Sequence, residues 1–516
     1  VAAISLSDNP RRAARLGAYE LQHHVRLITG AKLPIVSDSA APGEAEHPAP
    51  EKGRQQTRIL LGERAVHASN ALRENAWNSQ EYRIIFEKNV ILLAGRDADN
   101  REPVEYGPDK PYAFKTFPKM TEAQGTLHAV YRFLEQFCGV RWWNPTDAGT
   151  TCPSEPTLTV RAKDVQARPA FPYRSIGAWA GRSEWIPRTQ CYWHHKSQKD
   201  QYNAYEKAAY PSLYDRYADN GWKRLHAMRT VNRLWLLRMR LGGSERYSCN
   251  HSVGIYYDRF WAKHPKHPDR FVEKRPDWFA QGYQGRPPQP CFTNDALTQH
   301  VIQHARQTFD ANPDRRYFPL EPADNSRFCQ CADCRALVNK DQLDNPFFAN
   351  GRHSNYWFSF VNDVAKNVGK THPERYVATL AYMTHSYPPV DLELPKNVTI
   401  QTCLHARHCY DTAIQKNDRR FARAWRERNP DRRMFLWLYY CFPKARAGNS
   451  ERWHCFPGYF MRDIAQSFRW YQQMDFRGAF FNGWAGGINA YVTLQMLQDP
   501  MQDVQSMLDD FYTSYY

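Results

Sequence analysis

The sequence predicts an α/β protein with two domains, a small N-terminal α/β domain at residues 1–165 and a (β/α)8 barrel at residues 166–516. The 516 residues exceed one ordinary core, and 42% of them are hydrophobic, enough for large cores. From about residue 168, apolar strand-like runs alternate with amphipathic segments, which is typical of a barrel. A doubly wound open sheet is the competing architecture, but no glycine fingerprint follows the first of these strands.

The elements of the N-terminal domain follow from local patterns. Residues 1–7 are predicted to form a strand, and they lack the charged start and long apolar centre of a signal peptide. Residues 11–28 carry apolar side chains at helical spacing, and Gly30 follows at a natural helix end. The other predicted elements are strands at residues 33–36, 58–62, 82–86, 90–95 and 140–143 and a helix at residues 126–137.

The barrel is predicted from eight apolar runs with helices between several of them. Residues 356–368 and 411–428 have the apolar spacing of amphipathic helices. The eight predicted strands are residues 173–179, 231–237, 288–292, 317–320, 376–382, 398–402, 434–440 and 478–484. In such a barrel the active site lies at the carboxyl ends of the strands, so the residues that follow each run are the candidates for function.

Charge and composition exclude some classes of protein. The formal net charge is +16, but Lys and Arg are scattered among acidic residues and no known nucleic-acid motif is present. A basic solvated face, able to attract anionic glycans, is the favoured interpretation. No apolar stretch approaches the roughly 20 residues that a membrane span needs. Twelve irregularly spaced cysteines in this length do not form a disulfide scaffold.

Two carboxylates end the fourth predicted strand. Glu321 follows the run at residues 317–320 directly, and Asp324 comes three residues later. Two acids at the mouth of a strand suit acid/base catalysis on a sugar. The alternative is a solvated loop with an Asx turn at Asp324. The position of the acids in the strand series favours the catalytic interpretation.

Aromatic and polar residues mark the ends of the other predicted strands. A pyranose stacks its C–H face on rings, while its hydroxyl groups need polar partners, so this mixture predicts a glycan site. Ordinary barrel filling is the alternative for any single aromatic residue. The predicted substrate-binding residues are Trp179, His251, Asn294, Tyr382, Tyr440, Asn482 and Trp484.

Several segments resemble known glycosidases. Residues 21–35, 125–135 and 139–143 resemble the accessory α/β domain that precedes many glycosidase barrels, including those of hexosaminidases and α-glucuronidases. The segments around His251, Glu321 and Cys329 are similar to a bacterial group first catalogued as a domain of unknown function. The other segments of this resemblance are residues 276–279, 499–504 and 511–516. Part of that group is glycoside hydrolase family 163, endo-β-N-acetylglucosaminidases that act on N-glycans.

The resemblance implies a mechanism and roles. Glu321 is the expected general acid/base, and Asp324 either supplies a neighbouring negative charge or orients the substrate's acetamido group, which attacks the anomeric carbon. In hexosaminidase-like enzymes the two acids are adjacent or one residue apart, whereas here they are three apart. Tyr382 and Tyr440 are expected to bind the acetamido oxygen, and Trp484 to form the floor of the subsite. Catalysis needs no cofactor.

Three cysteines follow the candidate site in a Cys-x-Cys-x-x-Cys pattern, Cys329, Cys331 and Cys334. Cysteines this close rarely pair with one another. A structural tetrahedral zinc would need a fourth ligand. The alternatives are reduced buried thiols, or a disulfide to Cys403 or Cys409. The candidates for the fourth zinc ligand are Cys403, His405, His408 and Cys409.

These observations predict a glycoside hydrolase that cleaves β-linked N-acetylglucosamine in glycans, with retention of configuration. We expect it to be secreted or periplasmic, its signal peptide having been removed; a cytosolic protein is the alternative. A glycosidase for uronic or neutral sugars is favoured instead if arginines line the pocket, with Arg182, Arg238 and Arg407 as candidates. The alternative from another class is a non-catalytic glycan-binding protein.

Overall fold

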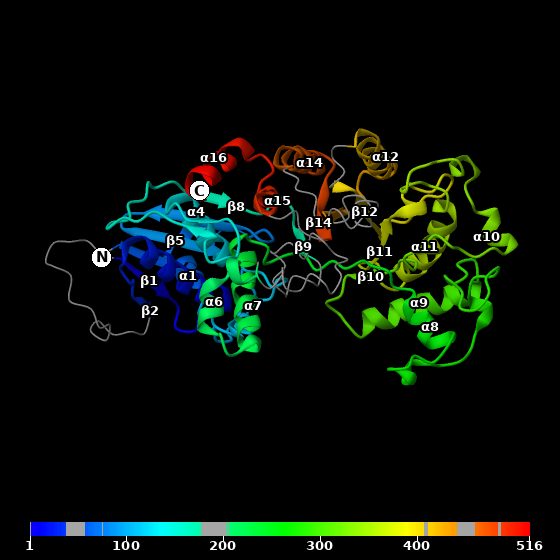
Figure 1. The fold of residues 1–516 in the computed structure, drawn as a ribbon, viewed down its shortest axis with the longest axis horizontal. Coiled ribbons are helices and arrows are strands. Elements are labelled where there is room, and N and C mark those ends of the chain that lie inside the picture. Colours follow the sequence, from blue (N-terminus) through cyan, green and yellow to red (C-terminus); the bar gives the residue numbers. More distant parts are fainter. Residues whose placement is uncertain are drawn as a thin grey trace. The chain divides into compact units, whose positions relative to one another are not determined.

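The computed structural model describes residues 2–37, 57–74, 76–176, 204, 206–406, 411–440, 460–482 and 487–515 (Figure 1). Its contacts group the chain into two units. Unit 1 comprises Val1–Glu245, Tyr440–Gln472 and Gly483–Tyr516, and unit 2 comprises Arg246–Tyr439 and Gln473–Asn482. This division does not coincide with the predicted domain boundary after residue 165, which stays a prediction. Within the described ranges, no helix is long and apolar enough to cross a membrane.

Unit 1 contains a six-stranded sheet of mixed direction. Strands β1, β2, β3 and β5 run parallel, and β4 pairs antiparallel with both β5 and β8. In spatial order the strands are β2 (Ile35–Ser37), β1 (Ala2–Leu6), β3 (Thr57–Leu61), β5 (Val90–Gly95), β4 (Tyr82–Glu87) and β8 (Val165–Ala167). The strands predicted at residues 1–7, 33–36, 58–62, 82–86 and 90–95 are therefore confirmed.

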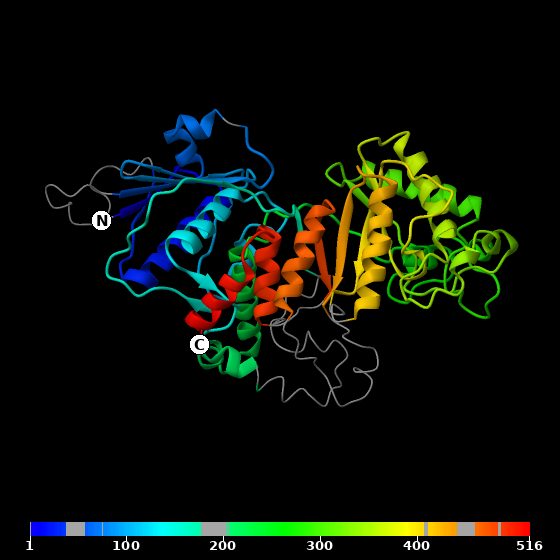
Figure 2. The same cartoon turned by 90° about the horizontal axis from the view of Figure 1, so that it is seen from above.

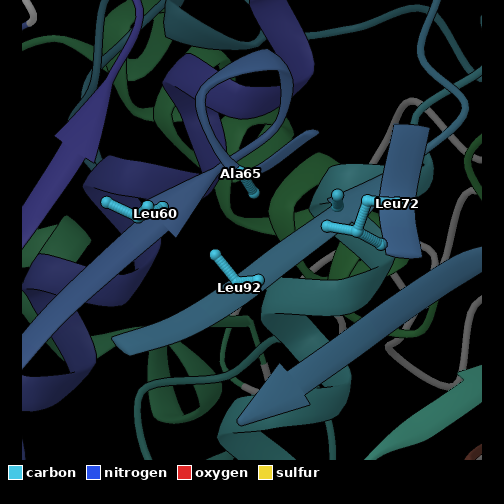
Figure 3. Packing of buried hydrophobic residues seen from close by; sticks show 5 residues of the cluster. Leu60, Ala65, Leu72 and Leu92 are labelled. Carbon is cyan, nitrogen blue, oxygen red and sulfur yellow. The ribbon is translucent and has the colours of Figure 1, made fainter. Parts of the chain in front are cut away.

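Helices cover both faces of this sheet (Figure 2). The helices α2 (Glu63–Ala68) and α3 (Asn70–Arg73) lie on one face. There Leu60 of β3 and Leu92 of β5 pack with Ala65 and Leu72 in one buried cluster (Figure 3). Since successive strand residues point to opposite faces, the neighbouring Leu61 faces the other side, where it lies close to Gly17 of a long helix.

That other face is covered by α1 (Arg12–Thr29) and α4 (Gly125–Phe137). Both helices were predicted. Gly30 has a φ of 75°, a left-handed conformation that glycine adopts without steric cost, and its N–H bonds the carbonyl oxygen of Arg26 at 2.8 Å. The two helices pack tightly, because Gly17 leaves room for the side chain of Val130.

The predicted second strand of the barrel is wrong. Residues 231–237 form the end of a helix in unit 1, α7 (Gly221–Arg238). The side chain of Asn220 caps this helix by accepting a hydrogen bond from the N–H of Lys223 at 2.9 Å. A short apolar run suits a buried helix as well as a buried strand, and here the cap and the 18-residue length decide for the helix.

The remaining elements of unit 1 are mostly helices. The strand predicted at residues 140–143 is confirmed in part as β6, and the one at 173–179 as β9. The elements are η1 (Ala113–Thr116), β6 (Arg141–Trp142), β7 (Thr150–Thr151), β9 (Tyr173–Ile176), α6 (Pro211–Arg216), most of α14 (Met461–Gln473), α15 (Ile488–Gln498) and α16 (Val504–Tyr515).

Unit 2 contains five adjacent parallel strands. Three of them, β11, β12 and β13, lie almost wholly out of solvent, which explains their nearly continuous apolar sequences. In spatial and chain order the strands are β10 (Tyr317–Pro319), β11 (Tyr376–Ala381), β12 (Val398–Leu404), β13 (Met434–Tyr439) and β14 (Phe476–Asn482). These correspond to the last five predicted strands, which are confirmed.

Two further helices of unit 2 confirm predictions, α11 (Ser354–Gly369) and α12 (Thr412–Arg428). The other helices are α8 (Gly254–Phe260), η4 (Pro268–Arg270), η5 (Pro276–Trp278), α9 (Asp295–Asp310), α10 (Ala332–Ala336), η6 (Lys340–Gln342) and η7 (Met383–His385). The strand predicted at residues 288–292 is wrong, because there only Pro290 forms an isolated bridge, with Phe279. In its described ranges, unit 2 shows a parallel α/β sheet that contains five of the eight predicted barrel strands, and closure into a (β/α)8 barrel stays a prediction.

Candidate functional site

The backbone of Glu321 is fixed where β10 ends. The N–H of Leu320 continues the sheet by bonding the carbonyl oxygen of Ala378 at 2.8 Å. The N–H of Glu321 donates to the hydroxyl oxygen of Ser252 at 2.9 Å, and the N–H of Ser252 donates to the carbonyl oxygen of Glu321 at 3.1 Å. This reciprocal pair holds Glu321 at the carboxyl edge of the sheet.

The side chain of Glu321 is completely enclosed, with an exposed fraction of 0%. Its Oε2 atom accepts hydrogen bonds from the hydroxyl of Thr379 and the N–H of Leu380, both at 2.9 Å. Its Oε1 atom lies 2.8 Å from Nε2 of His385, whose ring is also buried. Both carboxylate oxygens therefore have partners on β11 or just after it.

Asp324 is the exposed acid of the pair, with 65% of its side chain accessible. The hydroxyl of Tyr382 donates to Oδ1 of Asp324 at 3.1 Å. Nε2 of His251 lies 3.5 Å from the same oxygen. Nδ1 of His251 lies 2.6 Å from the carbonyl oxygen of Pro322, so this nitrogen carries a proton and holds the ring in place. The two predicted site residues Tyr382 and His251 thus both contact Asp324.

Four rings lie close together at the carboxyl ends of β11, β12 and β13, and we call them the aromatic edge: Phe348, Tyr382, His405 and Tyr439. The ring centroids of Phe348 lie 5.6 Å from Tyr382 and 5.7 Å from His405. The rings of His405 and Tyr439 stack at 6.0 Å. Phe348 is 51% exposed, and the other three are partly exposed, so the edge offers apolar faces beside Asp324.

Charge and burial shift the pKa values of Tyr382, Tyr439 and His405 in the aromatic edge. Burial raises the pKa of Tyr382, and the nearby Asp324 carboxylate raises it further, so the hydroxyl keeps the proton that it donates. Burial raises the pKa of Tyr439 as well. Burial acts to lower the pKa of His405, but the Asp418 carboxylate, 3.2 Å from Nδ1, outweighs it and raises this pKa.

Comparison with known proteins identifies the family. Residues 144–516 match the model of a family described as "Domain of unknown function (DUF4838)". The chain belongs to the DUF4838 family. A search of curated proteins finds no match.

Among solved structures, the DUF4838 chain is similar to a family 89 glycoside hydrolase from Clostridium perfringens in complex with 2-acetamido-1,2-dideoxynojirmycin, at 9% identity and a TM-score of 0.39. It is also similar to that family 89 protein with GlcNAc-alpha-1,4-galactose, named there as its substrate, and with PUGNAc, each at 8% identity, with TM-scores of 0.37 and 0.36. These matches cover 84% of the DUF4838 chain but only 46% of the other chains, so it spans less than half of their length.

Three other predicted site residues of the DUF4838 chain make contacts of their own. Asn294 caps α9, where its side chain accepts from the N–H of Leu297 at 2.9 Å. Tyr440 belongs to unit 1 and is buried, 3.3 Å from the hydroxyl of Thr493. Asn482 ends β14 and pairs in register with Tyr439. Trp179 and Trp484 lie outside the described residues.

Arg238, one of the three arginines considered for a uronic-acid pocket, is bonded to Glu20 instead. That side chain is buried in unit 1, where its Nε atom lies 2.7 Å from Oε2 of Glu20. Arg238 is therefore a core residue. Arg182 and Arg407 lie outside the described residues.

Phe348 of the aromatic edge and Asp418, the partner of His405, were not predicted from the sequence. Asp418 lies on α12, 13 residues after its partner His405, and Phe348 lies in a loop. No local motif connects them to the predicted acids. His385 and Tyr439 were detectable, because each stands at the end of a predicted strand.

The three cysteines of the Cys-x-Cys-x-x-Cys pattern lie together, as their spacing predicted. The fourth cysteine beside them is Cys291, not one of the residues predicted near the end of β12. Of those, Cys403 is buried on β12 and His405 pairs with Asp418. His408 and Cys409 lie outside the described residues.

Proposed function

We propose that this DUF4838 chain is a glycoside hydrolase that cleaves β-linked N-acetylglucosamine in glycans at the carboxyl edge of β10 to β13. The observation that carries the proposal is the exposed Asp324 carboxylate, bonded by Tyr382 and flanked by the aromatic edge. The rings offer stacking faces for the C–H groups of a pyranose, and the carboxylate lies where a glycosidic oxygen would reach it. The linkage and the sugar come from the resemblance to glycoside hydrolase family 163.

For the acid/base role we propose Asp324 in place of Glu321. A general acid must come within hydrogen-bond reach of the oxygen that it protonates, and only Asp324 is exposed. In its protonated form, the carboxyl group of Asp324 gives a proton to the glycosidic oxygen while the substrate's acetamido oxygen attacks the anomeric carbon and the glycosidic bond breaks. Asp324 then takes a proton from the water that opens the cyclic intermediate, and configuration is retained.

We assign Glu321 a positioning role. Its carboxylate joins the end of β10 to Thr379 and Leu380 of β11 and to His385. Asp324 lies three residues further along the same chain segment. Displacement of this anchor would therefore move Asp324 relative to Tyr382.

The test uses the full chain with aryl N-acetylglucosaminides of β and α linkage and with a panel of N-glycans, whose products are identified by mass. We expect β cleavage, a fall of about 10²- to 10⁴-fold in kcat for Asp324→Asn, and a smaller fall for Tyr382→Phe. For Glu321→Gln we expect a folded protein that keeps part of its activity. Azide rescue of Glu321→Ala but not of Asp324→Ala would overturn our assignment and return the acid/base role to Glu321. Cleavage of only α-linked substrates would overturn the linkage.

A non-catalytic glycan-binding protein is the second candidate. The enclosure of Glu321 favours it, because Asp324 is then the one acid of the pair that a glycan reaches, whereas most glycosidases use two carboxylates. Binding of glycans without product from any member of the panel would support this candidate. Loss of that binding in Phe348→Ala would place the glycan on the aromatic edge.

A further inference from the structure

Four cysteine side chains of unit 2 converge on one point. The Sγ atoms of Cys291, Cys329, Cys331 and Cys334 all lie within 4.8 Å of one another. Three of these residues are buried, and Cys331 is partly exposed. Cys291 comes from the segment before α9, and the other three come from the loop before α10 and from α10 itself. The cluster therefore joins two segments that are 38 residues apart at their nearest members.

The spacing of the sulfurs suits a metal better than a disulfide. The Sγ atoms of Cys291 and Cys334 lie 3.7 Å apart. Bonded sulfurs in a disulfide lie about 2.05 Å apart, and the cysteines that the structure describes are all unbridged. Four thiolates at about 2.3 Å from a tetrahedral zinc lie about 3.8 Å from one another. The observed separation is close to that edge length.

Polar groups surround the sulfurs. The backbone N–H of Gln281 donates to Sγ of Cys329 at 3.3 Å. The hydroxyl oxygen of Thr293 lies 3.1 Å from Sγ of Cys334, and that of Tyr356 lies 3.4 Å from the same sulfur. The Tyr356 oxygen already accepts the N–H of Phe292 at 3.1 Å, so its own proton can point to the sulfur. Donors of this kind stabilise metal-bound thiolates and orient them.

We propose that Cys291, Cys329, Cys331 and Cys334 bind one zinc ion in a closed tetrahedral site. Four thiolates at tetrahedral spacing select zinc or iron among the common metals, and four protein ligands leave no open position for a substrate. The site is therefore structural. It differs from the sequence-based prediction in its fourth ligand, Cys291.

The zinc site secures the loop that carries Asp324. Gln289, two residues before Cys291, is fully buried. Its Nε2 donates to the carbonyl oxygens of Ala323 at 2.8 Å and Asn325 at 2.9 Å, and its Oε1 accepts the N–H of Ala323 at 2.9 Å. The residues on both sides of Asp324 are thus bonded to the segment that the metal holds. This consequence for catalysis rests on the proposed function, whereas the metal site does not.

The experiment measures metal and thiols in the full, untagged chain purified under reducing conditions. We expect roughly one zinc per chain by mass spectrometry, and four thiols that react with Ellman's reagent only after the metal is released. Replacement of zinc by cobalt should give the absorption bands of tetrahedral cobalt thiolate. Each of Cys291→Ser, Cys329→Ser, Cys331→Ser and Cys334→Ser should lower the zinc content several-fold, and the control Cys152→Ser should leave it unchanged.

Three results would overturn the proposal. The first is a zinc content below about a tenth of an equivalent together with four thiols that react in the native protein. The second is iron in place of zinc. The third is a disulfide between cysteines of the cluster. The cobalt spectrum of the wild-type chain keeps the test valid if the serine variants do not fold. Since none of these readouts requires activity, a failure of the metal site and a failure of the glycosidase proposal are distinguishable.

Discussion

The imidazole Nε2 of His385 lies 2.8 Å from Oε1 of Glu321, and Nδ1 of the same ring has no hydrogen-bond partner among the described residues. Nε2 therefore carries the proton that it donates to the Glu321 carboxylate, and no bond at Nδ1 prevents the proton from moving there if the partner at position 321 changes. The other oxygen of Glu321 has no such freedom. The hydroxyl of Thr379 accepts the N–H of Trp357 at 2.9 Å and must donate to Glu321, as must the N–H of Leu380.

This difference between the two oxygens of Glu321 predicts that three substitutions lower the free energy of unfolding by different amounts. Glu321→Gln can keep its oxygen toward Thr379 and turn its amide to His385, so we expect a loss of about 1 kcal/mol in the free energy of unfolding. Glu321→Ala leaves the buried donors without an acceptor and should cost at least about 3 kcal/mol. The exposed Asp324→Asn should stay within about 0.5 kcal/mol. Urea unfolding measures all three, and equal losses would contradict the enclosed position of Glu321.

The hydrogen bonds from Gln289 to Ala323 and Asn325, which we call the Gln289 clamp, predict that the loop around Asp324 can be loosened without loss of the metal. Gln289→Ala removes three hydrogen bonds from the buried Gln289 side chain to the loop around Asp324, so we expect a loss of about 2–3 kcal/mol in the free energy of unfolding and reduced turnover. The zinc content should not change, because all four thiols remain. The matched control is Gln281→Ala, an exposed glutamine whose backbone N–H still reaches Cys329. An equal effect of both substitutions on turnover would exclude the clamp.

His24 predicts a pH dependence of stability in unit 1. Burial is the main cause that lowers the pKa of His24 to about 3, and its ring accepts the Trp142 indole N–H at 2.9 Å while Nδ1 bonds the carbonyl oxygen of Glu20. The unfolded chain has a histidine pKa of about 6.5, so the stabilisation is complete above that pH and is lost as pH falls toward 3. Between about pH 7.5 and 5 the loss from this group should be about 2 kcal/mol.

Urea unfolding at both pH values, for the wild type and for His24→Gln, isolates this contribution. Other buried histidines such as His128, whose pKa is also lowered by burial, act equally in both proteins. The variant should be less stable at neutral pH and should depend less on pH. An unchanged pH dependence would show that His24 is not the responsible group.

Gly95 predicts a strict steric requirement where β5 ends. A Cβ atom at this position would lie 2.3 Å from the carbonyl carbon of Gly125, the first residue of α4. Gly95→Ala must push the helix from the sheet, and we expect a cost of at least about 2 kcal/mol. The control is Gly254→Ala at the start of α8, where no atom lies within 4 Å, and it should be neutral or slightly stabilising. Thermal unfolding distinguishes the two, and a neutral Gly95→Ala would refute the close approach.

Much of the fold was predictable, because local patterns carry it. The helix α1 follows from apolar periodicity and from Gly30, which takes the left-handed conformation at its end. The strand β11, which ends before Tyr382, follows from its apolar run. Residues 231–237 were not predictable in this way, since an apolar run without polar alternation does not distinguish a buried strand from a buried helix. The clustering of Cys329, Cys331 and Cys334 was predictable from their spacing alone.

The sequence by itself thus determined most of the described strands, the helices α1, α4, α11 and α12, the two acids that follow β10 and three of the four clustered cysteines. Only the tertiary structure decided that Glu321 is enclosed and Asp324 exposed, that Tyr382 bonds an acid 58 residues away, and that Cys291 completes the cluster. The physical reason is the range of the forces involved. Backbone propensity and side-chain periodicity act over a few residues, whereas the contacts of the site depend on how strands and loops distant in the chain pack together.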